Sequence, residues 1–294
     1  MTGLRAGLKG LRTTPRDLPT VLAAALLSLL AGIGAAAGGT ARGGAPKGGG
    51  IAAPAQAAPA GRHATAGRRE ARAIEHTRRA TPFIARGSPH RREVALTFDD
   101  GPGPDTPRII GVLRRLHAAA TFFVVGQQAD RFGSILRAEG ADGFAIGNHT
   151  QNHAALGRLR PPAQRHQLWA AAQRAHRYGV QPMGFFRPPY GSYNAATLQV
   201  ASELGLLMVL WSTDTGDYRR PGVNAIVRAA LRRASPGAIV LMHDGGGPRR
   251  QTVRALPRIV RALRRRGFRL VTVPQMLADA PAPRRQLRPP GSGQ

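Results

Sequence analysis

The sequence contains no cysteine, and only two of its 43 basic residues are lysines, Lys9 and Lys47. Without cysteine the chain can form no disulfide framework, thiolate zinc site, iron-sulfur cluster or cysteine nucleophile. Any metal ion must therefore be held by histidines and carboxylates. Because the positive charge is almost entirely arginine, a coding bias explains it as readily as selection for a ligand.

Acidic residues are also scarce, with 15 Asp plus Glu and a formal net charge of +28. Residues 1–92 and 93–294 are both net positive, so the charge is spread along the chain. Such a surface attracts wall polymers, lipid headgroups and nucleic acid alike, and a solvated basic surface is the simplest interpretation. No nucleic-acid motif accompanies the charge, and we expect no nucleic-acid partner.

The first 41 residues have the layout of an export segment. Four basic residues precede a charge-free stretch rich in Ala and Leu at 18–41. Small residues at 35–37 offer a cleavage site, which is typical of a signal peptide. About 20 apolar residues also suffice to span a bilayer. We therefore expect a signal peptide or a membrane anchor over 1–41, and an extracellular or cell-surface protein.

Two segments are poor in large apolar residues. Residues 42–91 consist mainly of Gly, Ala, Pro and Arg, and residues 281–294 are basic and rich in Pro. Chains of this composition bury too little surface to offset the entropy of ordering. The sequence predicts a disordered basic linker over 42–91, which could contact anionic wall polymers or lipid, and a disordered tail over 281–294.

Residues 92–280 alternate between short apolar runs and amphipathic stretches. This alternation predicts parallel strands joined by crossover helices in one α/β domain, and the absence of a glycine-rich nucleotide motif favours a barrel of about seven units. The predicted strands are 94–98, 121–125, 144–146, 185–186, 206–211, 239–242 and 268–273. The predicted helices are 107–116, 127–139, 162–178, 195–204, 223–233 and 252–266.

Polar clusters follow five of these strands, at the end of a barrel where chemistry takes place. His149 and His153 can present two imidazoles to one ion, and Asp100 completes a set that leaves positions open for water and substrate. This ligand set suits both a zinc hydrolase and a non-haem iron oxygenase. Asp99 as a base and His243 as an acid, on opposite sides of the metal, favour hydrolysis.

Three further charged residues could support this acid and base. Arg187 could pair with Asp99, and either Asp217 or Asp244 could hold His243 in its protonated form. A surface salt bridge is an equally simple role for Arg187. Capping of a helix or turn is at least as common a role for the two aspartates.

The five clusters resemble, in order and spacing, the motifs of polysaccharide deacetylases, the NodB-homology family or carbohydrate esterase family 4. They are TFDDGP at 97–102, HTQNH at 149–153, RPPYG at 187–191, DTGD at 214–217 and LMH at 241–243. The resemblance covers residues 92–276. It implies a distorted barrel of about seven strands and a divalent ion, usually zinc. It also implies the removal of N-acetyl, and sometimes O-acetyl, groups from sugars.

The resemblance assigns roles residue by residue. It implies that the metal ligands are Asp100, His149 and His153, and that the catalytic residues are Asp99 (base), His243 (acid), Arg187 (partner of the base) and Asp217 (partner of the acid). It places Tyr190, through its backbone N–H, at the oxyanion, Leu241 at the acetyl pocket, and Pro189 and Tyr218 among the substrate contacts. The family commonly has Trp where this chain has Tyr218, which changes a groove wall and leaves the acid and base intact.

These observations predict an exported, metal-dependent N-deacetylase that acts as a monomer. Near the membrane such an enzyme meets the N-acetyl sugars of peptidoglycan first, while chitin oligosaccharides and acetylxylan are alternative substrates. Two other classes are a glycan-binding pseudoenzyme with the same fold and a basic nucleic-acid-binding protein. The first alternative predicts metal or turnover to be absent, and the second predicts salt-dependent DNA binding without hydrolase activity.

Overall fold

The computed structural model describes residues 60–181 and 183–289 of the chain. The expected signal peptide or anchor and the first part of the expected linker lie outside these residues. Within the described ranges, no helix is both long enough and apolar enough to cross a membrane.

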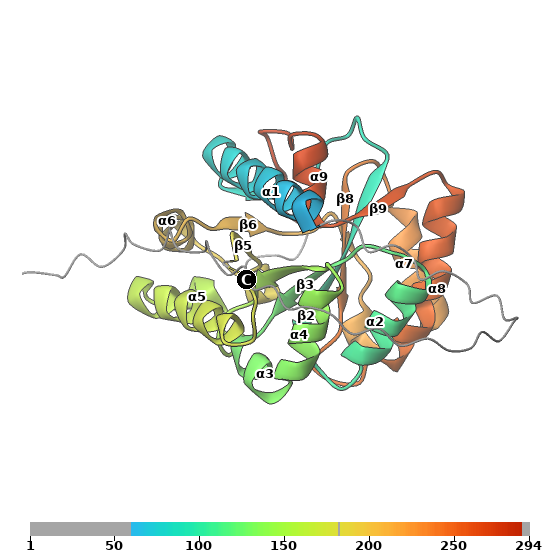
Figure 1. Cartoon of the computed structure of the whole chain (residues 1–294), viewed down its shortest axis with the longest axis horizontal. Helices are drawn as coiled ribbons and strands as arrows, with labels where there is room; N and C mark the ends of the chain where they lie inside the picture. The colour runs from blue at the N-terminus through green and yellow to red at the C-terminus, as the bar shows by residue number, and fades with distance from the viewer. Residues whose placement is uncertain (1–59, 182, 290–294) are drawn as a thin grey trace, which may run out of the picture. The chain divides into compact units, whose positions relative to one another are not determined.

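The described residues form a nine-stranded parallel sheet that curls into a distorted barrel (Figure 1). The strands pair in the order β1-β6-β5-β4-β3-β2-β8-β7, and β9 also pairs with β2. Their bounds are β1 Phe83–Ile84, β2 Glu93–Gly101, β3 Thr121–Val124, β4 Ala145–Asn148, β5 Phe185–Phe186, β6 Leu207–Val209, β7 Thr213–Asp214, β8 Ala238–His243 and β9 Arg269–Val271. The seven predicted strands are confirmed. The two strands that the sequence did not reveal, β1 and β7, have two residues each, too few for a recognisable pattern.

The barrel closes through the segment that joins β6 to β7. The backbone N–H of Leu210 donates to the carbonyl oxygen of Ile84 at 2.7 Å, which continues the pairing of β6 with β1. Two residues later, the N–H of Ser212 donates to Ile239 at 3.0 Å, and β7 then pairs with β8. One extended segment therefore leaves the β1 side of the sheet and joins β8.

The helices and 3₁₀ turns alternate with the strands, as expected. Their bounds are α1 Ala60–Ala80, α2 Thr106–Arg115, α3 Gly126–Arg131, α4 Gly133–Ala141, η1 Leu156–Arg158, α5 Pro161–His176, η2 Pro189–Gly191, α6 Ala195–Glu203, η3 Asp217–Arg219, α7 Val223–Arg232, α8 Arg250–Arg265 and α9 Val273–Asp279. Helices α2, α8 and α7 lie side by side on one side of the sheet (Figure 1). The apolar face of α8 is buried there, through residues that include Leu256, Val260 and Leu263.

Strand β2 shows how the barrel positions a polar site. Its side chains alternate between two faces, with a period of two residues. Val94, Leu96 and Phe98 pack in the core that also contains residues of α2 and α8. The alternate residues Thr97 and Asp99 are also buried, and both contact Arg187. The interior of the barrel thus places a carboxylate at the end of β2.

The predicted helix at 127–139 is two helices, α3 and α4, that meet at Phe132. The backbone of Phe132 leaves helical geometry, with φ −131° and ψ 37°. The next residue, Gly133, packs directly against Tyr178, where a Cβ atom would lie 2.1 Å from a ring carbon. The chain therefore bends at the point where it passes close to the turn that follows α5.

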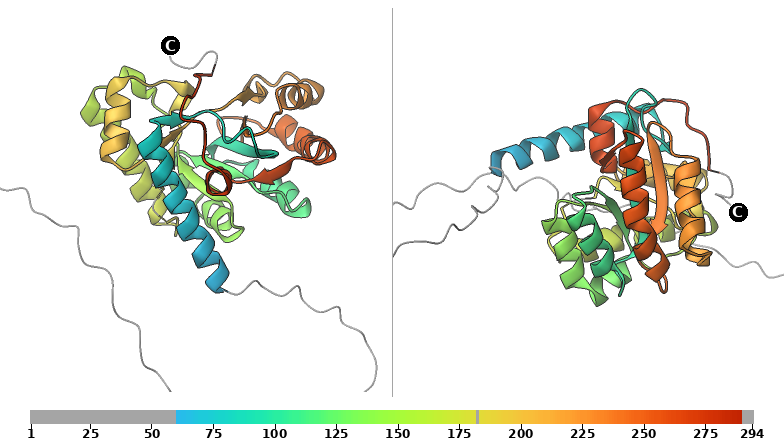
Figure 2. Two further views of the ribbon diagram at one scale, coloured as in Figure 1. Left: turned by 90° about the horizontal axis from the view of Figure 1, so that it is seen from above. Right: turned by 90° about the vertical axis from the view of Figure 1, so that its right-hand side faces the viewer.

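Residues 60–91 and 281–289 depart from the predicted linker and tail. Helix α1 packs beside α9 (Figure 2), and the side chain of Ile84 in β1 is fully buried. In the tail, the side chain of Gln286 bonds to the backbone of Ala85 and Arg86, and Arg288 donates to the hydroxyl of Tyr193. Alanine and arginine have high helix propensity, so a segment rich in them forms a stable helix once it can pack against another part of the protein.

Candidate active site

The carboxyl ends of the parallel strands surround a cavity of about 680 Å³. Asp99 and Asp100 come from β2, whereas His149 and His153 follow β4. His243 ends β8, next to Asp99 in the strand register. These five side chains, which are far apart in the sequence, all line this cavity.

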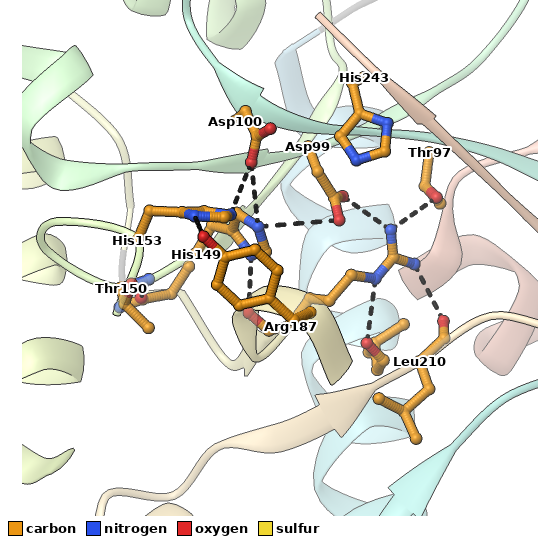
Figure 3. Close-up of polar contacts among 12 residues, drawn as sticks. Thr97, Asp99, Asp100, His149, Thr150, His153, Arg187, Leu210 and His243 are labelled. Atoms are coloured by element: carbon orange, nitrogen blue, oxygen red, sulfur yellow. Dashed lines mark hydrogen bonds and ion pairs between the residues drawn. The ribbon is translucent and has the colours of Figure 1, made fainter. Parts of the chain in front are cut away.

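Asp100, His149 and His153 form a candidate metal site (Figure 3). The Nε2 atoms of His149 and His153 lie 3.4 Å and 2.9 Å from Oδ1 of Asp100. The three candidate ligand atoms lie within 4.8 Å of one another. Oδ1 of Asp100 is buried and has no hydrogen-bond partner among the described residues. A shared cation would satisfy this oxygen.

The outer nitrogen of each imidazole has its own partner. Nδ1 of His149 lies 2.7 Å from the carbonyl oxygen of Arg187. Because a carbonyl oxygen can only accept, this Nδ1 carries the proton, and the lone pair on Nε2 is available to a metal. Nδ1 of His153 lies 3.0 Å from the hydroxyl of Tyr190. Such contacts orient metal-ligating histidines, and two imidazoles with one carboxylate fit a divalent ion.

The backbone at this site is strained. Asp100, Thr150, His153 and Tyr190 have positive φ angles of 73°, 68°, 62° and 61°. Residues other than glycine rarely adopt this region, which costs of order 1–3 kcal/mol per residue when the surrounding structure enforces it. Two of the four are candidate metal ligands, so the fold holds the ligands in place against a local conformational cost.

Arg187 holds Asp99 in place. Its guanidinium donates to Oδ1 of Asp99 at 2.7 Å and to the hydroxyl of Thr97 at 2.8 Å. It also donates to the backbone oxygens of Val209 and Leu210, at 3.1 Å and 2.9 Å. Arg187 is fully buried, and Figure 3 shows its guanidinium beside Thr97, Asp99 and Leu210. The ion pair expected from the sequence is present and belongs to the interior rather than the surface.

His243 is paired with Asp217. Its Nδ1 lies 2.8 Å from Oδ1 of Asp217, and its backbone N–H donates to Oδ2 at 2.9 Å. Burial alone would lower the pKa of His243, but the hydrogen bond and charge of Asp217, with the charges of Asp100 and Asp99, raise it to about 9. Thr252 donates to Asp217 as well, at 2.7 Å. The imidazole therefore holds its proton at neutral pH.

Asp244, the other carboxylate considered as a partner of His243, lies elsewhere. Its Oδ2 accepts a hydrogen bond from the hydroxyl of Thr106 at 2.5 Å. Burial raises the pKa of Asp244 to about 7, helped by the nearby charges of Asp100 and Asp99 and opposed by the hydrogen bond from Thr106. The side chain after a strand end points to the opposite face, which separates Asp244 from the imidazole of its neighbour.

Three of the four expected substrate contacts line the cavity. They are Tyr190, Tyr218 and Leu241. The ring of Tyr218 stands edge-on to that of His243, with the centroids 5.3 Å apart. Pro189 is buried and does not line the cavity, because η2 turns its ring into the protein and leaves Tyr190, 64% exposed, at the surface.

Several lining residues were missed by sequence reasoning. Gln127 and Gln128 follow β3. They are not titratable, so nothing at this strand end pointed to a functional site. Trp211 lies just beyond β6, where it was counted as part of an apolar strand. An aromatic residue at the carboxyl end of a barrel strand is the signal that could have identified it.

Comparison with known proteins identifies the family. A family model for polysaccharide deacetylases matches residues 86–209. A peptidoglycan-N-acetylglucosamine deacetylase from Bacillus cereus is 38% identical over 187 residues, covering 63% of this chain and 87% of that protein. A chitooligosaccharide deacetylase from a Bradyrhizobium species is 40% identical over 200 residues, covering 63% and 90%. The crystal structure of a peptidoglycan N-acetylglucosamine deacetylase has a TM-score of 0.65 and 34% identity, covering 67% and 92%.

The chain belongs to the polysaccharide deacetylase family. It is a hydrolase of the carbohydrate esterase family 4 class. That family is metal-dependent, and the Asp100, His149 and His153 group could bind a metal. Membership decides between the two chemistries that the ligand set left open, in favour of the hydrolase.

Proposed function

We propose that the enzyme removes N-acetyl groups from the amino sugars of peptidoglycan. The observation that carries this proposal is the candidate metal site, with Asp99 and His243 lining the same cavity. Supporting it, two of the similar proteins described above carry names that specify peptidoglycan N-acetylglucosamine as substrate. Chitin oligosaccharides and acetylxylan are the alternative substrates that the experiment must distinguish.

The metal ion in this proposal is zinc, held by Asp100, His149 and His153. A donor set of two imidazoles and one carboxylate is common in catalytic zinc sites. When bound, the ion would polarise the acetyl group and lower the pKa of the attacking water. Because Nδ1 of His149 carries the proton, the lone pair on its Nε2 would be available to the ion.

Asp99 acts as the general base. It is buried, and its second oxygen lies 3.8 Å from Nε2 of His149, close to where the attacking water must stand. The bond from Arg187 occupies Oδ1 and leaves Oδ2 to accept a proton from that water. A base needs this proximity to the proton that it removes.

His243 acts as the general acid. The leaving amine must gain a proton when the tetrahedral intermediate collapses, and a charged imidazole can supply it. Asp217 keeps that proton on the ring between turnovers. The backbone N–H of Tyr190 stabilises the oxyanion, Leu241 packs against the acetyl methyl, and Tyr218 contacts the sugar beside it.

The proposed place of action is outside the cell. The basic leader and apolar stretch of residues 1–41 direct the chain to the membrane, and the enzyme is secreted or stays anchored there as a monomer. The arginine-rich segment that follows contacts anionic wall polymers or lipid.

Acetate release by the purified full chain tests this proposal. Peptidoglycan, chitotetraose and acetylxylan are offered separately, with chelator and then with zinc added back. The proposal predicts release from peptidoglycan that chelator abolishes and zinc restores. Release from acetylxylan alone would contradict it, as would release that is indifferent to chelator.

A further inference from the structure

A second cavity lies beside the catalytic one. It has a volume of about 470 Å³ and shares Asp100, Gln128 and Gly246 with the cavity described above. The shared wall is a glycine loop at 245–247 that lies directly against β2. A Cβ atom on Gly245 would lie 2.0 Å from the carbonyl oxygen of Asp100, so only glycine allows this approach. A substrate bound at the metal site therefore has a neighbouring space within reach.

Three arginines from three helices line this second cavity. They are Arg108 on α2, Arg131 at the end of α3 and Arg250 at the start of α8. All three are exposed to solvent. Residues so far apart in the sequence converge here only because the loops after β2, β3 and β8 meet at one end of the barrel.

Within the described part of the chain, the two carboxylates that line the second cavity leave two of its three arginines without an ion pair. Asp105 accepts hydrogen bonds from Arg108 and from the backbone N–H of Arg249, both at 2.7 Å. Asp100 faces the two histidines of the metal site. Among the described residues, Arg131 and Arg250 form no ion pair. The guanidinium groups of Arg131 and Arg250 are thus open to a ligand in a concave site next to the reaction centre.

We propose that this cavity is an anion subsite that binds a carboxylate on the sugar next to the one being deacetylated. A guanidinium pairs with a carboxylate through two parallel hydrogen bonds, which gives both affinity and orientation. This inference rests on the proposed function and narrows its substrate class to acidic glycans. Peptidoglycan strands carry lactyl and stem-peptide carboxylates beside their N-acetyl groups, whereas chitin is neutral.

Steady-state kinetics on three substrates tests the subsite. The first is neutral chitotetraose, the second is glycan strands whose stem peptides have been removed to free the lactyl carboxylates, and the third is the same strands after methyl esterification. For the wild-type enzyme, esterification raises KM about tenfold, which corresponds to the loss of one good charge-assisted pair. This comparison needs no variant, so it does not depend on the folding of one.

The variant Arg131→Gln/Arg250→Gln should show the same KM for free and for esterified strands. Its kcat/KM on neutral chitotetraose should stay within about twofold of the wild-type value. The control Arg261→Gln/Arg265→Gln removes the same charge from exposed sites on α8, outside both cavities. This variant should keep the lower KM for free than for esterified strands. A further substrate is strands with intact stem peptides, whose lactyl groups carry no free carboxylate. Comparing the KM for these strands with that for the peptide-free strands distinguishes lactyl from peptide carboxylates as the group bound.

Equal KM values for free and esterified strands with wild-type enzyme would overturn the subsite. An equal fall in kcat/KM on all substrates for the double variant would also overturn it, because the two arginines would then act in catalysis or folding rather than in binding a carboxylate. Failure of the wild-type enzyme on every substrate is a different result. It would contradict the proposed function itself, and the subsite would fall with it.

Discussion

The carbonyl oxygen of Arg187 accepts a hydrogen bond from Nδ1 of His149 at 2.7 Å. The guanidinium of the same residue donates to Asp99 at 2.7 Å. One buried residue therefore orients both a candidate metal ligand and the proposed base. The guanidinium of Arg187 is itself packed over the ring of Phe123, with its central carbon 4.1 Å from the ring centre.

Replacing Arg187 with methionine should impair both folding and catalysis. The change leaves Asp99 as a buried charge without a partner, which costs roughly 3–5 kcal/mol of unfolding free energy. Turnover should fall by about 100-fold or more, since the base loses its orientation. Thermal unfolding and acetate release measure the two effects. Arg261→Met on the exposed face of α8 is the control, and equal behaviour of the two variants would contradict this role.

The pH profile should report His243. Its pKa is raised to about 9, so the proton that it must donate is present below that pH and is lost as pH rises through it. We expect kcat/KM to fall on the alkaline side near pH 9. Asp217→Asn removes the hydrogen bond to a charged carboxylate that raises the pKa of His243, while burial still lowers that pKa. The decrease in kcat/KM should therefore occur at lower pH in this variant. An alkaline limb at the same pH in both enzymes would show that another group is responsible.

Tyr218 should affect substrate binding more than chemistry. Its ring is 38% exposed and lines the cavity beside His243. Tyr218→Ala removes an aromatic wall worth about 0.5–1.5 kcal/mol, so KM should rise roughly two- to twelvefold with a smaller change in kcat. Tyr218→Trp keeps the wall and serves as the control. A fall in kcat with unchanged KM for the alanine variant would place Tyr218 in the chemical step instead.

The contact between the tail and β1 should stabilise the fold. The amide of Gln286 accepts from Ala85 and donates to the carbonyl oxygen of Arg86. Gln286→Ala leaves these backbone groups without a partner and should cost about 1–3 kcal/mol in chemical denaturation. Gln173→Ala, at an exposed site on α5, should change stability by less than about 0.5 kcal/mol. Matching values for the two variants would show that the tail contributes nothing.

The catalytic part of the fold was predictable because its patterns are long and local. Strand β2 and helix α8 show their periods in the sequence, and the polar clusters fall at strand ends, so the grouping of Asp100 with His149 and His153 follows from parallel topology. The ion pair between Arg187 and Asp99 could be anticipated for the same reason.

Other features depend on packing that the sequence does not display. Helix α1 has the composition of a linker and orders against α9, and β1 is only two residues long. The residues alone left both Asp217 and Asp244 open as partners of His243, and only the family resemblance pointed to Asp217, because the direction of each side chain from its backbone is not visible in the sequence. Gln128 and Trp211 carry no charge, so no titratable pattern marked them.

The most direct test of the central claim measures metal content and acetate release together in Asp99→Asn and His149→Ala. Asp99→Asn keeps the three candidate ligands and the shape of the base but removes its ability to take a proton. The proposed roles predict that this variant retains bound metal and loses turnover, whereas His149→Ala loses both. A near-normal rate in metal-loaded Asp99→Asn would contradict the assignment of Asp99 as the base.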